Sequence, residues 1–412
     1  MLKLSFILKN KNKIIENLQK RDFKYKLLIN DILLLNNKIK KIKKKIDNIS
    51  KIINKFSKNY IFFKKKIYKD IINIKKKKKK LNKKYKYYKK KIFKKNIIIP
   101  NIIDKIYFKN KKNNNKTIIY EYGKEKLKIK YNFIDHIELS KKFEIFNTKI
   151  SSNISGTGFV IYSGLGLKLY KALLNYFLYF NNKNGYKEYI LPYLIKKQSI
   201  YGTGQYPKNK NQIYNINKDK LYLIPTAEIP LINIYQNKLF NYNDLPIKAQ
   251  SYTECFRREA GSYGKNVKGL NRLHQFGKVE IIEICDNISS NLRLKKMLNH
   301  IKKLLKSLDV YFRIILLPCN DISNTSSITY DFEIYCFGLK RWIEVSSLSN
   351  CTDYQSNNLN IRFIKKNKKY FCHTLNGSSL SIPRVLASII ELYQCKKKNR
   401  IVIPNILLPF YN

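Results

Sequence analysis

Between residues 28 and 56, apolar side chains recur at alternating steps of three and four. A second series runs from residue 60 to 92, with Lys78 in one of the expected apolar positions. This spacing is the a and d pattern of a coiled coil, and two successive steps of four early in the second series predict a local stutter. No Pro precedes Pro100 and no Gly precedes Gly123, so neither helix is interrupted. The pattern predicts an antiparallel hairpin of two helices joined at "SKN", each roughly 50 Å long at 1.5 Å per residue.

The positive charge of the chain is concentrated in this same segment. The 412 residues contain 84 Lys and Arg and 27 Asp and Glu, for a formal net charge of +57. Residues 1–100 alone contain 35 of the basic and five of the acidic residues. A surplus of this size favours a polyanionic partner, with nucleic acid ahead of an anionic membrane. We therefore expect the hairpin to bind nucleic acid; a dimerising coiled coil without that role is the alternative.

Composition divides the chain into a helical arm at 1–100, a linker at 101–132 that contains the polar loop "KNKKNNNK", and a second domain at 133–412. Short alternating strands appear in the second domain. Three examples are 278–285, 330–337 and 341–347. Strands in this order, with few helical crossovers between them, favour a mainly antiparallel α+β domain.

The seven cysteines indicate a reducing compartment. They lie between Cys255 and Cys395, with no CxxC pair and no Cys/His spacing suited to zinc. The apolar run at the start of the chain is too short for a signal peptide, and nowhere do 18 apolar residues follow one another. We expect a soluble, cytoplasmic protein with reduced thiols.

The stretch "CFRREAGSYG" has arginines where the chain otherwise uses lysine. Only ten of the basic residues are Arg, and only one of these precedes Arg257. The sequence predicts a strand that ends at Arg257, a loop with Gly261, Gly264 and Gly269, and a returning strand at "HQFGKVE". An arginine beside Phe276 can hold a phosphate through its planar fork while the ring stacks on a base. A surface salt bridge to the nearby glutamate is the alternative, which leaves the glycines unexplained.

Three further segments place polar residues at the ends of elements. In "IPTAEIPL", taken alone, Thr226 is better explained as the N-cap of an ordinary helix at a strand-to-helix junction. In "RWIEVSSLSN", Glu344 and Ser347 offer hard oxygen ligands for Mg²⁺, and buried hydrogen bonding explains them equally well. In "NGSSLSIPRVLASIIE", Ser381 or Ser379 caps a helix that has a proline in its first turn. The arginine that follows the proline projects from the positive end of that helix, and a plain helix start would not require it.

Taken together, these segments resemble the seryl-tRNA synthetases over almost the whole chain. The segments "TAEIPL", "CFRREAGSYG", "HQFGKVE", "EVSSLSN" and "NGSSL" followed by Arg384 occur in that family's order and spacing, after the N-terminal hairpin. The resemblance implies an α+β class II synthetase: a coiled-coil arm followed by a domain with a mainly antiparallel sheet flanked by helices.

The resemblance also implies an activity. A homodimer would activate L-serine with ATP to seryl-adenylate and transfer the serine to the 3′ end of tRNA(Ser), which the basic arm grips. Whether tRNA(Sec) is a second substrate stays open. The alternative is an RNA-binding class II paralogue with weak or lost charging activity.

Site roles follow from the same resemblance, position by position. The serine pocket would be lined by Thr226, Ala227, Glu228, Glu280, Asn376 and Ser378. ATP would be bound by Arg257, Arg258, Glu259, Phe276, Glu344, Val345, Ser346, Ser347 and Arg384. Among these, Arg257 would bind the α-phosphate and Glu259 would face the adenine. Phe276 and Arg384 would sandwich the adenine ring, Arg257 and Arg384 would be the catalytic residues, and Glu344 with Ser347 would hold Mg²⁺.

Three residues depart from the family pattern. Arg258 stands where a small residue is usual, Ser379 where glycine is usual, and Pro383 where glycine is common. A glycine at the position of Ser379 would allow a positive φ or a close approach of the amino acid. These differences bear on the rate of the reaction more than on its identity.

Overall fold

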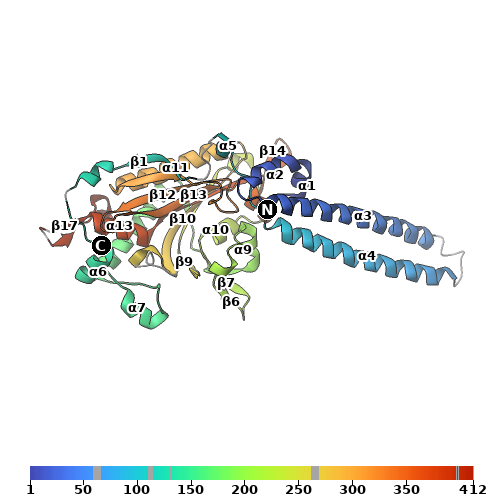
Figure 1. The fold of residues 1–412 in the computed structure, drawn as a ribbon, viewed down its shortest axis with the longest axis horizontal. Coiled ribbons are helices and arrows are strands. Elements are labelled where there is room, and N and C mark those ends of the chain that lie inside the picture. The colour runs from blue at the N-terminus through green and yellow to red at the C-terminus, as the bar shows by residue number, and fades with distance from the viewer. Residues whose placement is uncertain are drawn as a thin grey trace. The chain divides into compact units, whose positions relative to one another are not determined.

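The computed structural model describes residues 1–58, 66–109, 115–129, 131–260, 269–395, 397 and 399–411. These residues form two compact units, Met1–Ile102 and Ile103–Asn412 (Figure 1). Three features predicted from the sequence lie outside the described residues: the turn between the two arms, most of the polar loop "KNKKNNNK", and the pair Gly261 and Gly264.

The first unit is helical. Its elements are α1 (Leu4–Lys9), α2 (Lys11–Gln19), α3 (Lys24–Lys58) and α4 (Lys66–Asn96). The two long helices run side by side in opposite directions (Figure 1), and the Lys95 Nζ atom lies 2.6 Å from the Asp31 Oδ2 atom across them.

The residues of the predicted stripe are the ones that the hairpin covers. Ile32 and Ile46 are buried on α3, and Ile71 and Ile92 are buried on α4. Lys78, which occupies an apolar position of the pattern, is half-buried like the stripe residues on either side of it. The predicted antiparallel hairpin is therefore confirmed, because burial follows the alternating three and four spacing.

The second unit is built on an eight-stranded sheet with the order β1-β11-β12-β13-β16-β10-β9-β4. Neighbouring strands are antiparallel except for the pair of β4 and β9. The strands are β1 (Thr117–Tyr122), β4 (Lys187–Glu188), β9 (Ile247–Phe256), β10 (Gln275–Cys285), β11 (Phe312–Leu316), β12 (Ile328–Cys336), β13 (Arg341–Asn350) and β16 (His373–Ser381). This confirms the mainly antiparallel α+β domain and the predicted hairpin of β9 and β10.

Strand β1 lies within the segment 101–132, which composition assigns to a linker. Thr117 pairs with Leu316 and Tyr122 with Phe312, so this stretch is an edge strand of the main sheet. The strand is mostly exposed. Only Tyr120 and Tyr122 pack against the main core, so the alternation by which a strand is recognised in a sequence is too short here to identify it.

Shorter elements complete the second unit. Its short helices are α5 (Ile106–Lys109), α6 (His136–Phe143), α7 (Thr148–Ser155) and α9 (Lys197–Thr203). Its small sheets comprise β2 (Phe146–Asn147) with β3 (Ile161–Tyr162), β5 (Leu194–Lys196) with β6 (Asn215–Ile216) and β7 (Leu221–Leu223), β8 (Leu239–Asn241) with β14 (Arg362–Lys365) and β15 (Lys368–Phe371), and β17 (Gln394–Cys395) with β18 (Arg400–Ile401). No helix in the described part of the chain is both long and apolar enough to span a membrane.

The two faces of the main sheet differ in what covers them. Helices α8 (Gly164–Lys183), α11 (Ser290–Ser307) and α13 (Ile382–Leu392) form the main core with Val279 and Ile281 of β10. Helices α10 (Glu228–Asn233) and α12 (Tyr354–Leu359) cover part of the opposite face, where Ile282 and Ile284 join a second apolar cluster. Side chains alternate between the faces along each strand. The polar residues of β10 that point away from the main core therefore lie on the part of the opposite face that the second cluster does not cover.

A β-bulge in β13 changes this alternation. Phe332 pairs with Ser346 and Glu333 pairs with Glu344, so Val345 is an extra residue without a partner on β12. An extra residue shifts the alternation by one position. Glu344 and Ser347, which strict alternation would place on opposite faces, consequently face the same side.

A second bulge lies in β16. Lys278 pairs with Ser381 and Glu280 pairs with Ser378, so two residues of β16 lie opposite one residue of β10. The positive φ that a glycine would supply at Ser379 falls instead on Leu380, at 73°. The Ser379 side chain points to the helical side.

The hydrogen bond of the Ser379 side chain explains that direction. Its Oγ atom donates to the Asn181 Oδ1 atom of α8 at 2.9 Å. The bulge thus turns the Ser379 side chain away from the uncovered face, so the residue that replaces the usual glycine does not project into that space.

Candidate active site

A cavity of about 430 Å³ opens on the uncovered face of β10, β13 and β16. Most of the residues predicted for the site line it: Thr226, Glu228, Arg257, Glu259, Phe276, Glu280, Glu344, Val345, Ser347, Asn376, Ser378 and Arg384. The structure thus brings together, in one cavity, segments that are up to about 160 residues apart in the sequence.

Three predicted residues do not line the cavity. Ala227 is fully buried at the start of α10. Arg258 is exposed, and its backbone N–H donates to the carbonyl oxygen of Gln212 at 2.9 Å. Ser346 faces the helical side of the sheet, where its hydroxyl donates to the carbonyl oxygen of Ser378 at 2.6 Å. The sequence motif contains these residues, but the local backbone directs their side chains elsewhere.

One end of the cavity is a buried polar cluster centred on Glu228. The Oε1 atom of Glu228 accepts from the amides of Asn376 at 2.9 Å and Gln355 at 2.7 Å. Burial, together with the nearby charge of Glu280, raises the pKa of Glu228 to about 7. The carboxyl group therefore changes its ionisation state close to neutral pH.

Thr226 links Glu228 to the neighbouring carboxylate. Its hydroxyl donates to the Glu280 Oε2 atom at 3.1 Å and accepts from the backbone N–H of Glu228 at 3.2 Å. Thr226 precedes the capping position of α10, which Ala227 occupies. The hydroxyl is therefore fixed between two acidic groups that face one space.

Lys278 was not predicted for the site, although it lines the cavity and belongs to this polar cluster. Its ammonium group forms an ion pair with Glu280 and donates to the Thr226 hydroxyl oxygen at 3.2 Å. Lys278 is two residues before Glu280 on β10 and so shares its face of the strand. That spacing is the signal that could have identified it, but one lysine is inconspicuous in a chain so rich in lysine.

Gln355 was not predicted either. It is fully buried in α12, and its amide nitrogen donates to Glu228 and to the carbonyl oxygen of Thr203. Its amide oxygen accepts from the Thr374 hydroxyl at 2.7 Å, which fixes the orientation of the amide. A single glutamine in a short helix offers no motif, so nothing in its local sequence marks this role.

The other end of the cavity is cationic and aromatic. The Nε atom of Arg257 donates to the carbonyl oxygen of Pro225 at 3.2 Å, and its guanidinium carbon lies 5.2 Å from the centre of the Phe276 ring. The hydrogen bond and the cation–π contact fix the guanidinium at the rim of the β9 and β10 hairpin.

Arg384 connects three segments at this end. It lies in the first turn of α13, where Ser381 occupies the N-cap position without a side-chain cap bond, and Pro383 lies beside it. Its Nε atom donates to the carbonyl oxygen of Asn271 at 3.1 Å, and its Nη1 atom donates to that of Glu344 at 2.7 Å. The predicted helix start with a projecting arginine is confirmed.

Glu259 and Arg272 form an ion pair across the mouth of the same hairpin, with Nε and Oε2 2.5 Å apart. Glu259 has a positive φ of 48°. Both residues line the cavity, so the pair places one acidic and one basic side chain at its cationic end.

Asp331, an acidic residue beside Ser347 on the neighbouring strand, was also absent from the sequence prediction. Asp331 is the cross-strand partner of Ser347 on β12 and shares a hydrogen bond with it. Burial and the nearby Glu344 raise the pKa of Asp331 to about 7. Among the described residues, its Oδ1 atom is buried without a hydrogen-bond partner. Glu344, Ser347 and Asp331 together offer hard oxygen donors, which suit Mg²⁺.

Known proteins resemble this chain over its full length. Residues 212–393 match the family described as tRNA synthetase class II core domain (G, H, P, S and T). The chain is 40% identical to a serine–tRNA ligase from Hydrogenobaculum sp. (strain Y04AAS1) and 36% identical to one from Phytoplasma mali (strain AT). Each alignment covers 99% of this chain and 98% of the relative.

A solved structure also resembles this chain in its fold. The seryl-tRNA synthetase from Pyrococcus horikoshii complexed with ATP superposes with a TM-score of 0.90 at 26% identity. The match covers 100% of this chain and 98% of that one.

Proposed function

The chain belongs to the serine–tRNA ligase family, and from this premise we propose how its cavity activates serine. The overall activity joins L-serine to tRNA(Ser) at the expense of ATP. The observation that carries the proposal is that the buried acidic cluster of Glu228 and Glu280 and the cationic group of Arg257 and Arg384 line one cavity. An amino acid can therefore meet a nucleotide between them.

In the first step, the serine carboxylate attacks the α-phosphorus of ATP. A P–O bond to the serine carboxylate forms, the bond from the α-phosphorus to the bridging oxygen breaks, and pyrophosphate leaves with the electron pair. The carboxylate is already ionised at neutral pH, so the enzyme needs no general base. Catalysis then consists of positioning the reactants and neutralising the charge on the phosphates.

Arg257 supplies that charge at the α-phosphate. Its planar fork can bridge a phosphate oxygen and a carboxylate oxygen, which the point charge of a lysine ammonium cannot do. Phe276 and Arg384 enclose the adenine ring from its two sides, and Glu259 faces its edge. The contact between Arg257 and Phe276 supports this arrangement, because it places the guanidinium next to the ring on which the adenine would stack.

Mg²⁺ fits the group formed by Glu344 and Ser347. Both side chains line the cavity because of the bulge at Val345, and Asp331 hydrogen-bonds to Ser347 from the neighbouring strand β12. Mg²⁺ is commonly held by one or two carboxylates together with substrate phosphates. When bound, the cation offsets negative charge on ATP, while Asp331 orients the Ser347 hydroxyl.

The acidic cluster selects the amino acid. Glu280, with Thr226 and Lys278 beside it, is a buried acceptor that a serine hydroxyl or ammonium group can pair with. Alanine lacks the hydroxyl and would leave a buried polar group unpaired, which sites of this kind use to discriminate by about 10⁴ or more. Threonine must be rejected by the size of the pocket.

The N-terminal hairpin grips tRNA(Ser), and the enzyme acts as a homodimer in the cytoplasm. The support for the tRNA role is the concentration of lysine on α3 and α4, which supplies a strong, salt-sensitive attraction to phosphates. In the second step, the terminal ribose hydroxyl of the tRNA attacks the carbonyl carbon of seryl-adenylate, forms the ester and releases AMP.

The test is charging of a tRNA(Ser) transcript with labelled serine. The matched control is the same transcript after periodate oxidation, which removes the terminal ribose hydroxyls. We expect ester formation with the intact transcript only. Binding of the transcript without any charging would contradict the proposal and favour an RNA-binding paralogue.

A further inference from the structure

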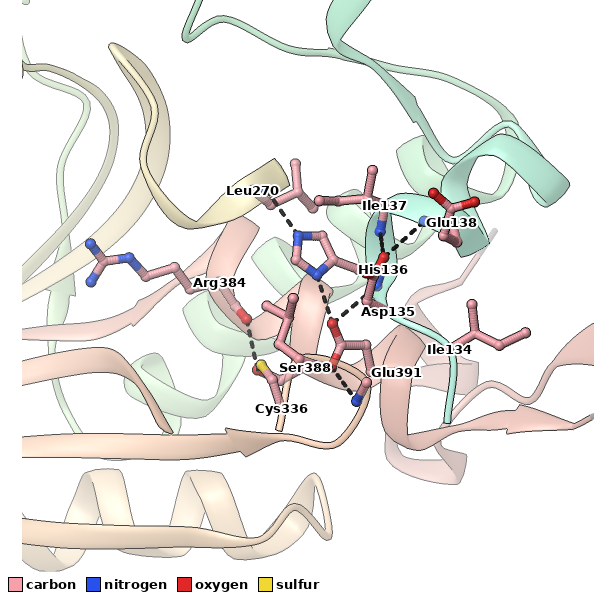
Figure 2. A network of polar contacts seen from close by, with 12 residues as sticks. Ile134, Asp135, His136, Ile137, Glu138, Leu270, Cys336, Arg384, Ser388 and Glu391 are labelled. Carbon is pink, nitrogen blue, oxygen red and sulfur yellow. Dashed lines mark hydrogen bonds and ion pairs between the residues drawn. The ribbon is translucent and has the colours of Figure 1, made fainter. Parts of the chain in front are cut away.

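A buried histidine and glutamate lie behind the cationic end of the cavity. His136 is the first residue of α6, whose N-cap Asp135 accepts from two backbone N–H groups. Glu391 lies in the last turn of α13, and both side chains are fully buried. The His136 Nδ1 atom lies 2.7 Å from the Glu391 Oε1 atom (Figure 2). The pair thus joins α6 to the far end of the helix that begins near Arg384.

Glu391 is held by donors on both of its oxygens. The Oε1 atom accepts from the ring and from the backbone N–H of His136, the latter at 3.0 Å. The Oε2 atom accepts from the backbone N–H groups of Gly338 at 2.8 Å and Leu339 at 3.2 Å. These bonds fix the carboxylate, and the carboxylate in turn fixes the orientation of the imidazole ring.

The second ring nitrogen of His136 binds the loop that follows β9. Its Nε2 atom accepts from the backbone N–H of Leu270 at 3.2 Å (Figure 2). Because Nε2 accepts, the ring proton is on Nδ1, which donates to Glu391. A Cβ atom on Gly269, whose φ is 74°, would lie 2.1 Å from Nε2. The backbone here approaches the ring as closely as a glycine permits.

The residues that follow Leu270 belong to the nucleotide end of the cavity. The carbonyl oxygen of Asn271 accepts from Arg384, and Arg272 pairs with Glu259. Leu270 and Asn271 are buried, so their position depends on what holds the backbone. Since His136 does not line the cavity, its effect on ATP would pass through this backbone.

We infer that His136 is a positioning residue for ATP. It fixes the point at which the loop returns to β10, and so holds the Asn271 carbonyl oxygen and Arg272 where Arg384 and Glu259 meet them. The inference rests on the proposed function for the ATP roles of Arg384 and Glu259. The geometry of the nucleotide site then depends on a buried residue that lies more than 100 positions before this loop in the sequence.

Two substitutions separate the two bonds of the ring. His136→Asn keeps a donor where Nδ1 stands, so the bond to Glu391 remains, but it has no atom that reaches Leu270. His136→Gln places an amide oxygen near the position of Nε2, so the bond to Leu270 remains and the donor to Glu391 is removed. The measurement is the KM for ATP and for serine in serine-dependent pyrophosphate exchange, together with hydrogen exchange at the Leu270 amide.

We expect His136→Asn to raise the KM for ATP about tenfold, equivalent to about 1.4 kcal/mol, and to speed exchange of the Leu270 amide. The KM for serine should stay near the wild-type value, and His136→Gln should retain most of the ATP affinity. Equal effects of the two variants, or an unchanged KM for ATP, would overturn the inference, because a purely structural role does not distinguish the two bonds.

Two further outcomes keep the test decisive. If His136→Asn does not fold, Gly269→Ala forces the loop and the imidazole ring apart, because the added Cβ would lie 2.1 Å from Nε2, and it should raise the KM for ATP in the same way. If the wild-type enzyme shows no serine-dependent exchange, the proposed function fails. The protection of the Leu270 amide in the two variants then still decides whether His136 anchors the loop.

Discussion

Glu344 and Ser347 face the same cavity although they lie three residues apart on one strand, because Val345 is an extra residue in the pairing with β12. Without the bulge, one of the two side chains would point into the helical core. The neighbour Ser346 does point there and binds the carbonyl oxygen of Ser378. The bulge therefore decides which of the two adjacent serines belongs to the site.

This arrangement predicts different effects for the same change at neighbouring serines. Ser347→Ala removes one of the two proposed ligands for Mg²⁺ and should raise the Mg²⁺ concentration needed for half-maximal pyrophosphate exchange by about tenfold. Ser346→Ala should leave the Mg²⁺ requirement unchanged and lower the free energy of unfolding by about 1–2 kcal/mol, because it removes a buried hydrogen bond. Titration of exchange with Mg²⁺ and urea unfolding measure the two quantities. A larger change in the Mg²⁺ requirement for the Ser346 variant would contradict the assignment.

The adjacent arginines provide a second matched pair. Arg257 lines the cavity and Arg258 is exposed outside it. Arg257→Lys keeps the charge but removes the fork, and should lower serine-dependent exchange by about 10²–10³. Arg258→Lys should stay near the wild-type rate. Similar losses in both variants would contradict the proposal that Arg257, and not Arg258, binds the phosphate.

The raised pKa of Glu228 predicts that the free energy of unfolding changes with pH. Its pKa is raised from 4.5 to about 7, so folding favours the protonated form. This contribution is fully present below about pH 4.5 and is lost as the pH rises through about 7. At 1.36 kcal/mol per pKa unit, the loss amounts to about 3 kcal/mol.

The check uses Glu228→Gln, which does not titrate. Between pH 5 and pH 8, the free energy of unfolding of the wild type should fall relative to that of the variant when both are measured by urea unfolding. A difference between the two proteins that is the same at both pH values would show that Glu228 is ionised throughout this range.

A helix or strand could be predicted from the sequence where its apolar residues recur at a regular spacing. The hairpin was predictable because the stripe residues along α3 and α4 are covered by the other helix, which makes burial periodic. Strands β10, β12 and β13 are buried along most of their length, and they were predictable because apolar and polar residue types largely alternate in these segments. Strand β1 was not, because it is a mostly exposed edge strand in which only Tyr120 and Tyr122 pack against the main core.

The site was predictable where it consists of short charged segments and not where single residues complete it. Arg257 and Glu228 were identified from their motifs. Gln355 and Asp331 reach the site from other elements through hydrogen bonds that no local pattern encodes. The bulges at Val345 and Leu380 depend on pairing between distant strands, so the face on which Ser379 lies could not be inferred from its own segment.

The lysines of the arm predict a salt-dependent affinity for tRNA. Lys75, Lys76, Lys77, Lys79 and Lys80 are exposed on α4, whereas Lys78 lies in the half-buried stripe. Replacing the five exposed residues by Gln should weaken tRNA binding. It should also reduce the slope of log affinity against log salt by up to about 0.9 for each phosphate that the variant no longer neutralises.

Filter binding at several salt concentrations measures this slope. Pyrophosphate exchange without tRNA serves as the control and should not change, since the arm and the cavity belong to different units. An unchanged slope in the variant would contradict a role for this run of lysines in binding tRNA.

Activation of serine in this cavity is the step on which every assigned role depends. It is measured by exchange of labelled pyrophosphate into ATP, with serine, threonine, alanine or glycine offered separately in the presence of Mg²⁺. We expect exchange with serine, and exchange with alanine lower by about 10⁴. Comparable exchange with alanine, or none with serine, would show that the cavity does not select and activate serine as proposed.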